Sequence, residues 1–235
     1  MATRTAHPYE DTDVIDSRAP RFNQGVIGSL ALLAFVLELE WLPALLAAQL
    51  AIGLAFGRQY CLPCLLYFEV VQPRFGEGRI EDSRPPRFAN MVGIAFLGGA
   101  TLAFALGGAT IGWALTLVVA ALALFAATSG VCAGCEMYRL SARLRGVARG
   151  GQRHPAHVDP GEVGLLDGAG GLVEFSHPLC AECREWEERL ARAGDPHVVI
   201  DVSARPELAR RYGVAVVPTV VAVAGDGTVT RRLAP

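Results

Sequence analysis

The segment from Asp82 to Tyr138 begins with the motif DSRPPRF (82–88), continues through an apolar stretch and ends in CAGCEMY (132–138). From Met91 to Cys135 it has no charged residue and no histidine. If this uncharged stretch is helical, it is long enough to cross a hydrocarbon core of about 30 Å twice. The glycine-rich sequence at 107–112 lies near the middle and predicts the turn between the two crossings.

An earlier segment has the same order of motifs. DSRAPRF (16–22) matches DSRPPRF at six of seven positions, and CLPCLLY (61–67) shares the C-x-x-C-x-x-Y pattern of CAGCEMY. Between these motifs, residues 22–57 are mostly apolar and carry charges only at Glu38 and Glu40, near a predicted turn. Two crossings in each repeat return the chain to its starting side. We therefore expect two parallel repeats, 16–67 and 82–138, related by an axis along the membrane normal.

These patterns predict that residues 1–145 form an all-α membrane domain of four helices arranged as two hairpins. A very apolar soluble helical core is the less favoured alternative. The chain has 21 basic residues, all of them arginine, and neither predicted hairpin tip carries one. The positive-inside rule then places both termini and all the cysteine pairs on the cytoplasmic side of a bacterial inner membrane.

The overall composition excludes several classes of protein. Hydrophobic residues make up 52% of the chain and charged residues only 19%, which excludes a disordered chain. A net charge of −2 argues against a nucleic-acid partner. These averages are typical of a chain that combines a very apolar part with a polar one.

The repeated DSR-x-PRF motif has two interpretations. Pro20 and Pro86 suit the first turn of a helix, and the neighbouring arginines would anchor each helix at the membrane interface. A less favoured alternative is that these arginines bind an anionic sulfur compound. The arginines concerned are Arg18, Arg21, Arg84 and Arg87.

The remaining residues predict a linker at 146–163 and a second domain at 164–235. In this domain we expect a strand at 171–176, the pair Cys180–Cys183, and a helix to about Ala193. A strand at 198–202, a short helix to about Tyr212, and two strands joined by an Asp-Gly turn follow. The order is β-α-β-α-β-β.

This order resembles the thioredoxin family over about residues 164–233. The resemblance is carried by Cys180-Ala181-Glu182-Cys183 at a strand-to-helix turn, by Glu174 six residues earlier, and by Val217-Pro218-Thr219. It implies an α/β thioredoxin-like domain without the family's final helix, with Glu174 as a buried acid and Pro218 in the cis form. A thiol at a helix N-terminus favours the thiolate, so Cys180 is the expected nucleophile. Cys183 would resolve the mixed disulfide, and Glu174 would accept its proton.

The cysteine pairs of the membrane half have three interpretations. Cys61, Cys64, Cys132 and Cys135 could form a redox relay with Cys180 and Cys183, since all would lie on one membrane side. Their C-x2-C…C-x2-C form also suits tetrahedral zinc and, less well, an iron–sulfur cluster. Simple packing of small cysteines inside helices is the third interpretation.

The membrane half also resembles a bacterial family described as domain of unknown function 4395. The resemblance rests on DSRPPRF and CAGCEMY, and it covers about residues 11–145. It implies sulfur or thiol metabolism, because such proteins are expected to accompany thioredoxin-like proteins and thiosulfate sulfurtransferases.

Together these features predict a membrane-anchored thiol–disulfide oxidoreductase. Its expected partners are the lipid bilayer and a protein disulfide or persulfide, for example on a sulfurtransferase. Two alternatives remain open. One is a transporter for a small sulfur compound, and the other is a zinc-stabilised membrane scaffold that carries a thioredoxin-like docking module.

Overall fold

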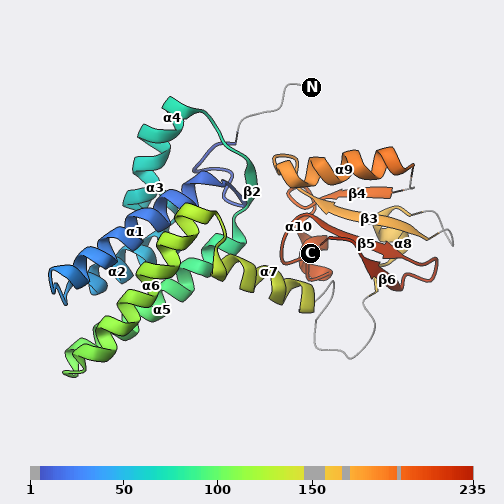
Figure 1. The fold of residues 1–235 in the computed structure, drawn as a ribbon. Helices are drawn as coiled ribbons and strands as arrows, with labels where there is room; N and C mark the ends of the chain where they lie inside the picture. Colours follow the sequence, from blue (N-terminus) through green and yellow to red (C-terminus); the bar gives the residue numbers. More distant parts are fainter. Residues whose placement is uncertain (1–5, 146–156, 166–169, 195–196, 235) are drawn as a thin grey trace. The chain divides into compact units, whose positions relative to one another are not determined.

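The computed structural model combines helices with a C-terminal sheet (Figure 1). It describes residues 6–145, 157–165, 170–194 and 197–234, with side chains up to residue 142 in the first of these ranges. The chain divides into two compact units, Thr5–Tyr138 and Arg139–Pro235. Each unit is described separately below.

Four long helices make up most of the first unit. They are α1 (Arg18–Val36), α2 (Leu42–Phe56), α5 (Arg84–Ala105) and α6 (Ala109–Ser129). Helix α1 packs along α6, and α2 packs along α5, so each helix lies mainly against a helix of the other repeat. Their core includes Ile27, Leu46 and Leu97.

Shorter helices follow the two apolar segments. After α2 come η1 (Arg58–Tyr60), α3 (Leu62–Leu66), η2 (Tyr67–Val71) and α4 (Gln72–Phe75). Helix α7 (Ala133–Arg145) follows α6. Both C-x-x-C pairs of this unit therefore lie where a short helix begins.

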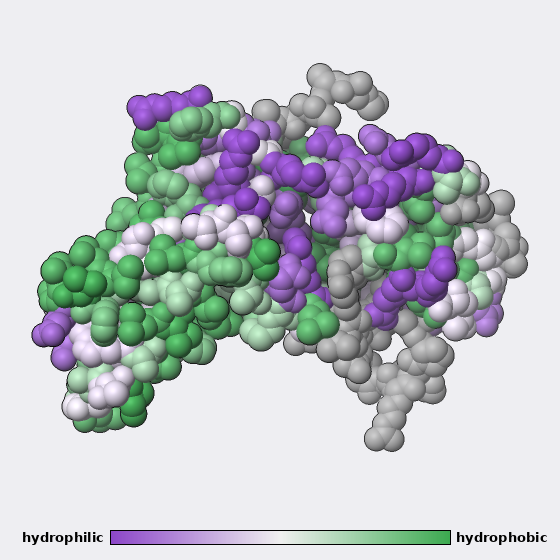
Figure 2. Space-filling model, viewed as in Figure 1, coloured by the Kyte–Doolittle hydropathy of each residue, from purple (hydrophilic) through white to green (hydrophobic). Residues whose placement is uncertain are grey.

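Two of the four predicted membrane spans have the required length and composition. Among the described residues, α5 and α6 are long and apolar enough to cross a membrane, whereas α2 is apolar but has 15 residues. Large hydrophobic side chains are exposed on all four long helices, and Figure 2 shows this apolar surface. Soluble monomers seldom expose so much apolar area. Examples are Leu33, Phe35, Leu45, Ile52, Leu102, Ile111 and Phe125.

The internal repeat has a direct structural counterpart. Strands β1 (Val14–Asp16) and β2 (Ile80–Asp82), each of which leads into one repeat, pair antiparallel. The phenylalanine of each DSR-x-PRF motif lies against the tyrosine of its own C-x-x-C-x-x-Y motif. The ring centroids are 5.8 Å apart for Phe22 and Tyr67 and 5.6 Å apart for Phe88 and Tyr138. The two repeated motifs thus form one contact in each repeat.

The aspartate of each repeated motif accepts a backbone N–H at the start of the helix that follows. Asp16 accepts a hydrogen bond of 2.9 Å from the Arg18 backbone N–H, and Asp82 accepts one of 2.7 Å from that of Arg84. These donors belong to the helix start, where backbone N–H groups have no partner within the helix. The buried Asp16 also accepts hydrogen bonds from the Tyr67 hydroxyl, the Gln72 side chain and the Gly78 backbone.

The second unit contains a four-stranded sheet with the order β4-β3-β5-β6. Strand β3 pairs parallel with β4 and antiparallel with β5, and β5 pairs antiparallel with β6. The strands are β3 (Gly171–Ser176), β4 (His197–Asp201), β5 (Thr219–Val223) and β6 (Val229–Arg232). The helices are α8 (Pro160–Val163), α9 (Ala181–Ala193) and α10 (Pro206–Arg211).

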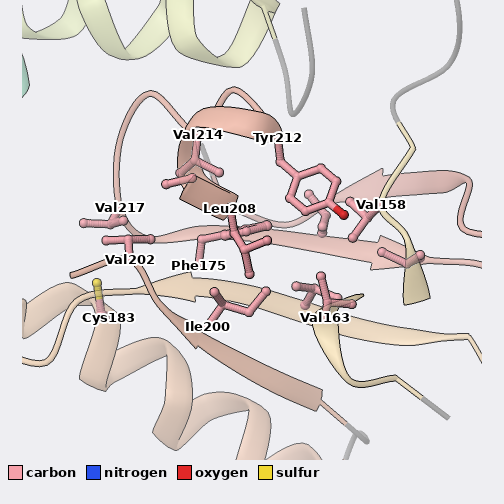
Figure 3. Close-up of a cluster of buried hydrophobic side chains, with 14 of the residues drawn as sticks. Val158, Val163, Phe175, Cys183, Ile200, Val202, Leu208, Tyr212, Val214 and Val217 are labelled. Atoms are coloured by element: carbon pink, nitrogen blue, oxygen red, sulfur yellow. The ribbon is translucent and has the colours of Figure 1, made fainter. Parts of the chain in front are cut away.

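Two hydrophobic clusters pack against this sheet. The larger one joins Phe175 and Ile200 to Leu208 and Tyr212, and Figure 3 shows it with Cys183 at its edge. The smaller one packs Leu190 of α9 against Val220 and is bordered by Trp186. Alternate residues of β3 therefore face opposite clusters, as strand geometry requires.

The predicted linker is shorter than expected. His157 forms a bridge with Thr228, and Val158 is buried in the larger cluster. Asp159 caps α8 by accepting hydrogen bonds from the backbone N–H groups of Gly161 and Glu162. Residues 157–163 thus belong to the folded second unit, while 146–156 lie outside the described residues.

Replacing Asp16 by Ala should lower the free energy of unfolding by about 3 kcal/mol, because four donors lose their acceptor at a buried position. Tyr67→Phe removes only one of these hydrogen bonds and should cost about 1 kcal/mol. Chemical denaturation of the purified full-length chain measures both values. Equal losses in the two variants would contradict the central role assigned to Asp16.

Candidate functional site

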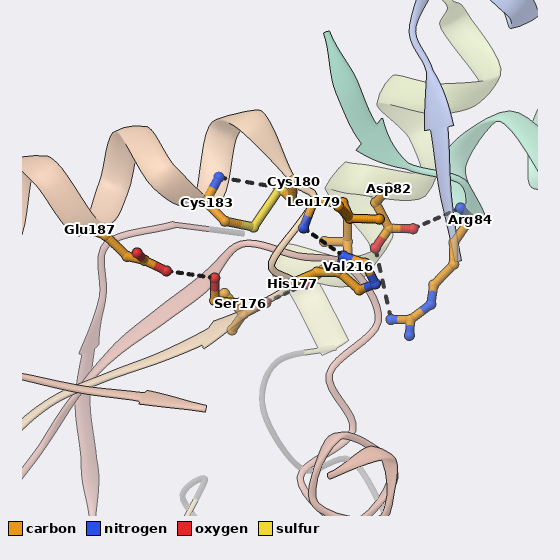
Figure 4. Close-up of a disulfide and its surroundings, with 10 residues drawn as sticks. Asp82, Arg84, Ser176, His177, Leu179, Cys180, Cys183, Glu187 and Val216 are labelled. Atoms are coloured by element: carbon orange, nitrogen blue, oxygen red, sulfur yellow. Dashed lines mark hydrogen bonds and ion pairs between the residues drawn. A yellow bond between two sulfur atoms is a disulfide. The ribbon is translucent and has the colours of Figure 1, made fainter. Parts of the chain in front are cut away.

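Cys180 and Cys183 lie at the start of α9 and form a disulfide (Figure 4). Cys180 is the residue that caps the helix, and its Sγ accepts a hydrogen bond of 3.2 Å from the Cys183 backbone N–H. The strand β3 ends four residues earlier, so the strand-to-helix turn places both sulfurs at the end of the sheet. A donor at a helix N-terminus stabilises a thiolate on the first cysteine once the disulfide is reduced.

The backbone around this pair is held by local hydrogen bonds. His177 Nδ1 accepts one of 3.2 Å from the Leu179 N–H, and the His177 carbonyl accepts one of 2.9 Å from the Cys180 N–H. The Val217–Pro218 bond is cis, as the resemblance implied. Strand β5 begins at Thr219, the residue after Pro218. The Thr219 hydroxyl donates to the Val216 carbonyl at 2.7 Å.

Glu174 is a buried carboxyl group in the middle of β3. Its exposed fraction is 0%, and neither carboxylate oxygen has a hydrogen-bond partner among the residues that the structure describes. Burial, and then the negative charge of Glu187, raise the pKa of Glu174 to about 8. A carboxyl group with such a pKa can hold or release a proton near neutral pH.

Cys61 and Cys64 form a second disulfide, at the start of α3. They line a cavity of about 280 Å³ with Arg58, Arg87 and Asn90. Arg58 is already bound to the protein, because its guanidinium donates to four backbone carbonyls between Pro8 and Val14. Burial lowers the pKa of Arg58 to about 10.

Cys132 and Cys135 are not disulfide-bonded and lie at the start of α7. Cys132 Sγ accepts hydrogen bonds from the Gln24 side-chain amide at 3.2 Å and from the Cys135 backbone N–H at 3.3 Å. A hydrogen bond from the Cys135 side chain makes the largest contribution to lowering the pKa of Cys132 to about 6. The two hydrogen bonds above act in the same direction, although burial opposes the shift. Cys132 is therefore suited to act as a thiolate nucleophile.

A second cavity, of about 400 Å³, lies beside Cys132. It shares four lining residues with the cavity beside the Cys61–Cys64 disulfide, namely Asn23, Gln24, Leu50 and Asn90. We call Asn23, Gln24 and Asn90 the amide wall. The structure thus places Cys132 and the Cys61–Cys64 disulfide in two cavities that share this wall.

Of the four arginines considered for anion binding, only Arg87 lines one of these two cavities. The backbone of Arg18 and that of Arg84 take part in the capping contacts, and the Arg84 side chain lies 3.9 Å from Asp82. Arg21 lies close to Gly130. The geometry therefore fits the helix-start role of the motif better than a site made by all four side chains.

The described residues contain no group of three or more histidine, cysteine, aspartate or glutamate side chains that could hold a metal ion. In particular, Cys61, Cys64, Cys132 and Cys135 do not form one four-cysteine cluster. The zinc and iron–sulfur interpretations remain predictions from spacing alone.

The amide wall was not anticipated from the sequence. Gln24 and Asn90 each follow the repeated phenylalanine by two residues, at Phe22 and Phe88. An amide at the same place in both repeats, inside an otherwise apolar helix, is the signal that could have identified them. Asn23 has no such signal, because Ala89 occupies the equivalent position.

Comparison with known proteins adds one match. The profile of a family described as "Domain of unknown function (DUF4395)" matches residues 15–143. Neither the curated proteins nor the solved structures contain a significant match to this chain. The matched region includes Cys61, Cys64, Cys132 and Cys135, and it ends before the sheet of the second unit.

Replacing Gln24 by Leu should raise the pKa of Cys132 by about one unit, because a hydrogen bond to a charged group contributes about 1.5 kcal/mol. The pH dependence of Cys132 alkylation by iodoacetamide, followed by mass spectrometry of the reduced chain, measures this pKa. Gln49→Leu is the matched control, since Gln49 donates to the Tyr60 carbonyl and contacts no thiol in the part of the chain described. A pKa unchanged in Gln24→Leu would show that this amide does not stabilise the thiolate.

Replacing Glu174 by Gln should remove a pH dependence of stability. The folded-state pKa of about 8 lies above the ordinary value of 4.5, so the folded chain binds the extra proton between these values. The free energy of unfolding of the parent should therefore fall as pH rises through this window, by up to about 1.4 kcal/mol per unit. Thermal denaturation of both chains from about pH 5 to about pH 9, which covers most of this window, measures the difference. Parallel curves for the two chains would refute the assigned pKa.

Proposed function

Since the chain belongs to the DUF4395 family, whose description names no activity, we propose from its own residues that it is a membrane-anchored thiol–disulfide oxidoreductase. The observation that carries the proposal is the Cys180–Cys183 disulfide at the start of α9, in one unit with a cis proline and a buried acid. A C-x-x-C pair alone is weak evidence, but this combination is typical of a site for disulfide exchange.

The fold of the second unit supports the proposal. The order β4-β3-β5-β6, with a cysteine pair after β3 and a cis proline before β5, fits a thioredoxin-like domain. In such a domain the proline-containing segment offers a backbone edge beside the sulfurs. A partner polypeptide can pair with that edge as an added strand. Cys180, Cys183, Glu174 and Pro218 are the proposed catalytic set.

The reaction proceeds in two steps that balance. The Cys180 thiolate attacks a partner disulfide, which forms a mixed disulfide and releases one partner thiolate. Cys183 then attacks the Cys180 sulfur, so that the Cys180–Cys183 bond forms and the second partner thiolate leaves. Two electrons pass from the chain to the partner. Glu174, with its raised pKa, accepts the Cys183 proton. A persulfide sulfur can replace the partner disulfide as the group attacked.

Attachment to a membrane is supported by the helices of the first unit. Helices α5 and α6 have the length and composition to span a bilayer, and the other two long helices expose apolar side chains. We propose four spans with both termini and all the cysteine pairs on the cytoplasmic side, since neither hairpin tip carries an arginine. On this side, the pairs Cys61–Cys64 and Cys132–Cys135 can exchange electrons with the second unit or with its partner protein. A sulfurtransferase is the proposed example of such a partner.

Replacing Cys183 by Ser should trap the mixed disulfide on Cys180, because the resolving thiol is absent. Non-reducing gels and mass spectrometry of the variant expressed in bacterial membranes should then show a covalent adduct that dithiothreitol releases. Its bond should join Cys180 to a partner cysteine or to one of the membrane-half cysteines. Cys180→Ser is the matched control and should trap at least tenfold less. Absence of any adduct on Cys180 would reject the exchange activity.

A further inference from the structure

The cavity beside Cys132 combines an apolar body with a polar end. Its apolar lining comes from the middle of the long helices and includes Phe96, Val118 and Leu122. The polar end contains the amide wall and the Cys132 thiol, and it lies near the starts of α1 and α5. A volume of about 400 Å³ falls within the range of about 300–1,000 Å³ that small-molecule sites occupy.

The cavity opens through the apolar surface of the helices. Val118 and Leu122 line it and are 41% and 49% exposed. Both belong to α6, one of the two helices long and apolar enough to cross a bilayer. A ligand that enters beside these side chains would come from an apolar phase, so it must itself be lipophilic.

One hydrogen-bond acceptor at the polar end has no donor. Asn23 is 5% exposed and lines the cavity, and within the described part of the chain its Oδ1 has no hydrogen-bond partner. A buried acceptor of this kind costs about 1–3 kcal/mol when it is left unpaired. A ligand that carries a hydroxyl group at this end would supply the missing donor.

The thiols define the chemistry that the ligand must complete. Cys132 Sγ accepts hydrogen bonds from the Gln24 side-chain amide and the Cys135 backbone N–H, both of which favour the thiolate, and Cys135 lies one helical turn away. A dithiol gives up two electrons when it becomes a disulfide. The ligand that fits is therefore a lipophilic two-electron acceptor whose reduced form carries hydroxyl groups. We propose that this cavity binds a quinone, which oxidises Cys132 and Cys135 to a disulfide and leaves as the hydroquinone.

The electrons and protons of this step balance. The Cys132 thiolate forms a transient bond to a ring carbon of the quinone. Cys135 then attacks the Cys132 sulfur, so the sulfur–sulfur bond forms while the sulfur–carbon bond breaks, and that electron pair stays on the ring. The hydroquinone takes one proton from Cys135 and one from solvent. One of its hydroxyl groups can donate to Asn23 Oδ1.

This activity goes beyond disulfide exchange at Cys180 and uses none of its residues. It would connect the chain's thiols to the membrane pool of redox carriers. The two activities can therefore fail separately, since trapping on Cys180 tests one and quinone reduction by Cys132 and Cys135 tests the other.

The test uses the purified full-length chain in detergent, reduced with dithiothreitol, desalted, and mixed under argon with decylubiquinone. Its ring is fully substituted, so it forms no stable thiol adducts. We expect hydroquinone to appear in the ultraviolet spectrum while alkylation mapping shows loss of the Cys132 and Cys135 thiols. Cys132→Ser should slow the reaction at least tenfold, whereas the Cys180→Ser/Cys183→Ser chain should still oxidise Cys132 and Cys135.

A matched pair of variants tests the cavity itself. Val118→Trp fills its mouth and should slow quinone reduction at least tenfold, whereas Ala121→Trp places the same side chain at an exposed position of α6 that does not line the cavity. Alkylation of Cys132 by the small reagent iodoacetamide shows whether each variant is folded. Equal quinone rates in the two variants, or Cys132 and Cys135 that stay reduced in excess quinone, would overturn the proposal.

Discussion

The unpaired backbone N–H groups at a helix start are the constraint on which both units depend. Each C-x-x-C pair occupies such a start, at α3, α7 and α9. At α7 and α9, the sulfur of the first cysteine accepts the backbone N–H of the second, at 3.3 Å and 3.2 Å. Aspartates perform the same role at α1 and α5. The chain thus meets one requirement of helix geometry with acceptors of two kinds, of which one is chemically reactive.

Similar backbone geometry does not give the three pairs the same chemistry. Cys180–Cys183 lies in a unit with a buried, unpartnered carboxyl group, which suits proton transfer during exchange. Cys61–Cys64 lines a cavity with Arg87, while Cys132 is held by an amide and borders an apolar cavity. The neighbours contributed by other helices therefore decide which reaction each pair can support.

The sequence predicted the second unit better than the first. The strand β3 and the helix α9 were foreseen, because the signals for each lie within a few residues of one another, and the resemblance to thioredoxin implied the cis Pro218. The packing of α1 along α6, and of α2 along α5, was not foreseen, since apolar helices carry no pattern that specifies a partner. The repeated amides Gln24 and Asn90 were visible in the sequence, but the wall that they form with Asn23 was not, because it exists only after helices from both repeats come together.

The amide wall has an energetic consequence for the first unit. Amides inside an apolar bundle cost free energy unless they are hydrogen-bonded, and apolar side chains of similar size would avoid that cost. Gln24 avoids that cost by donating a hydrogen bond to Cys132, whereas the Asn23 side-chain oxygen has no partner among the described residues. Packing alone therefore does not explain why Asn23 lies between the two cavities. An acceptor left unpaired beside a reactive thiol is explained when the bound ligand, rather than the protein, supplies the donor.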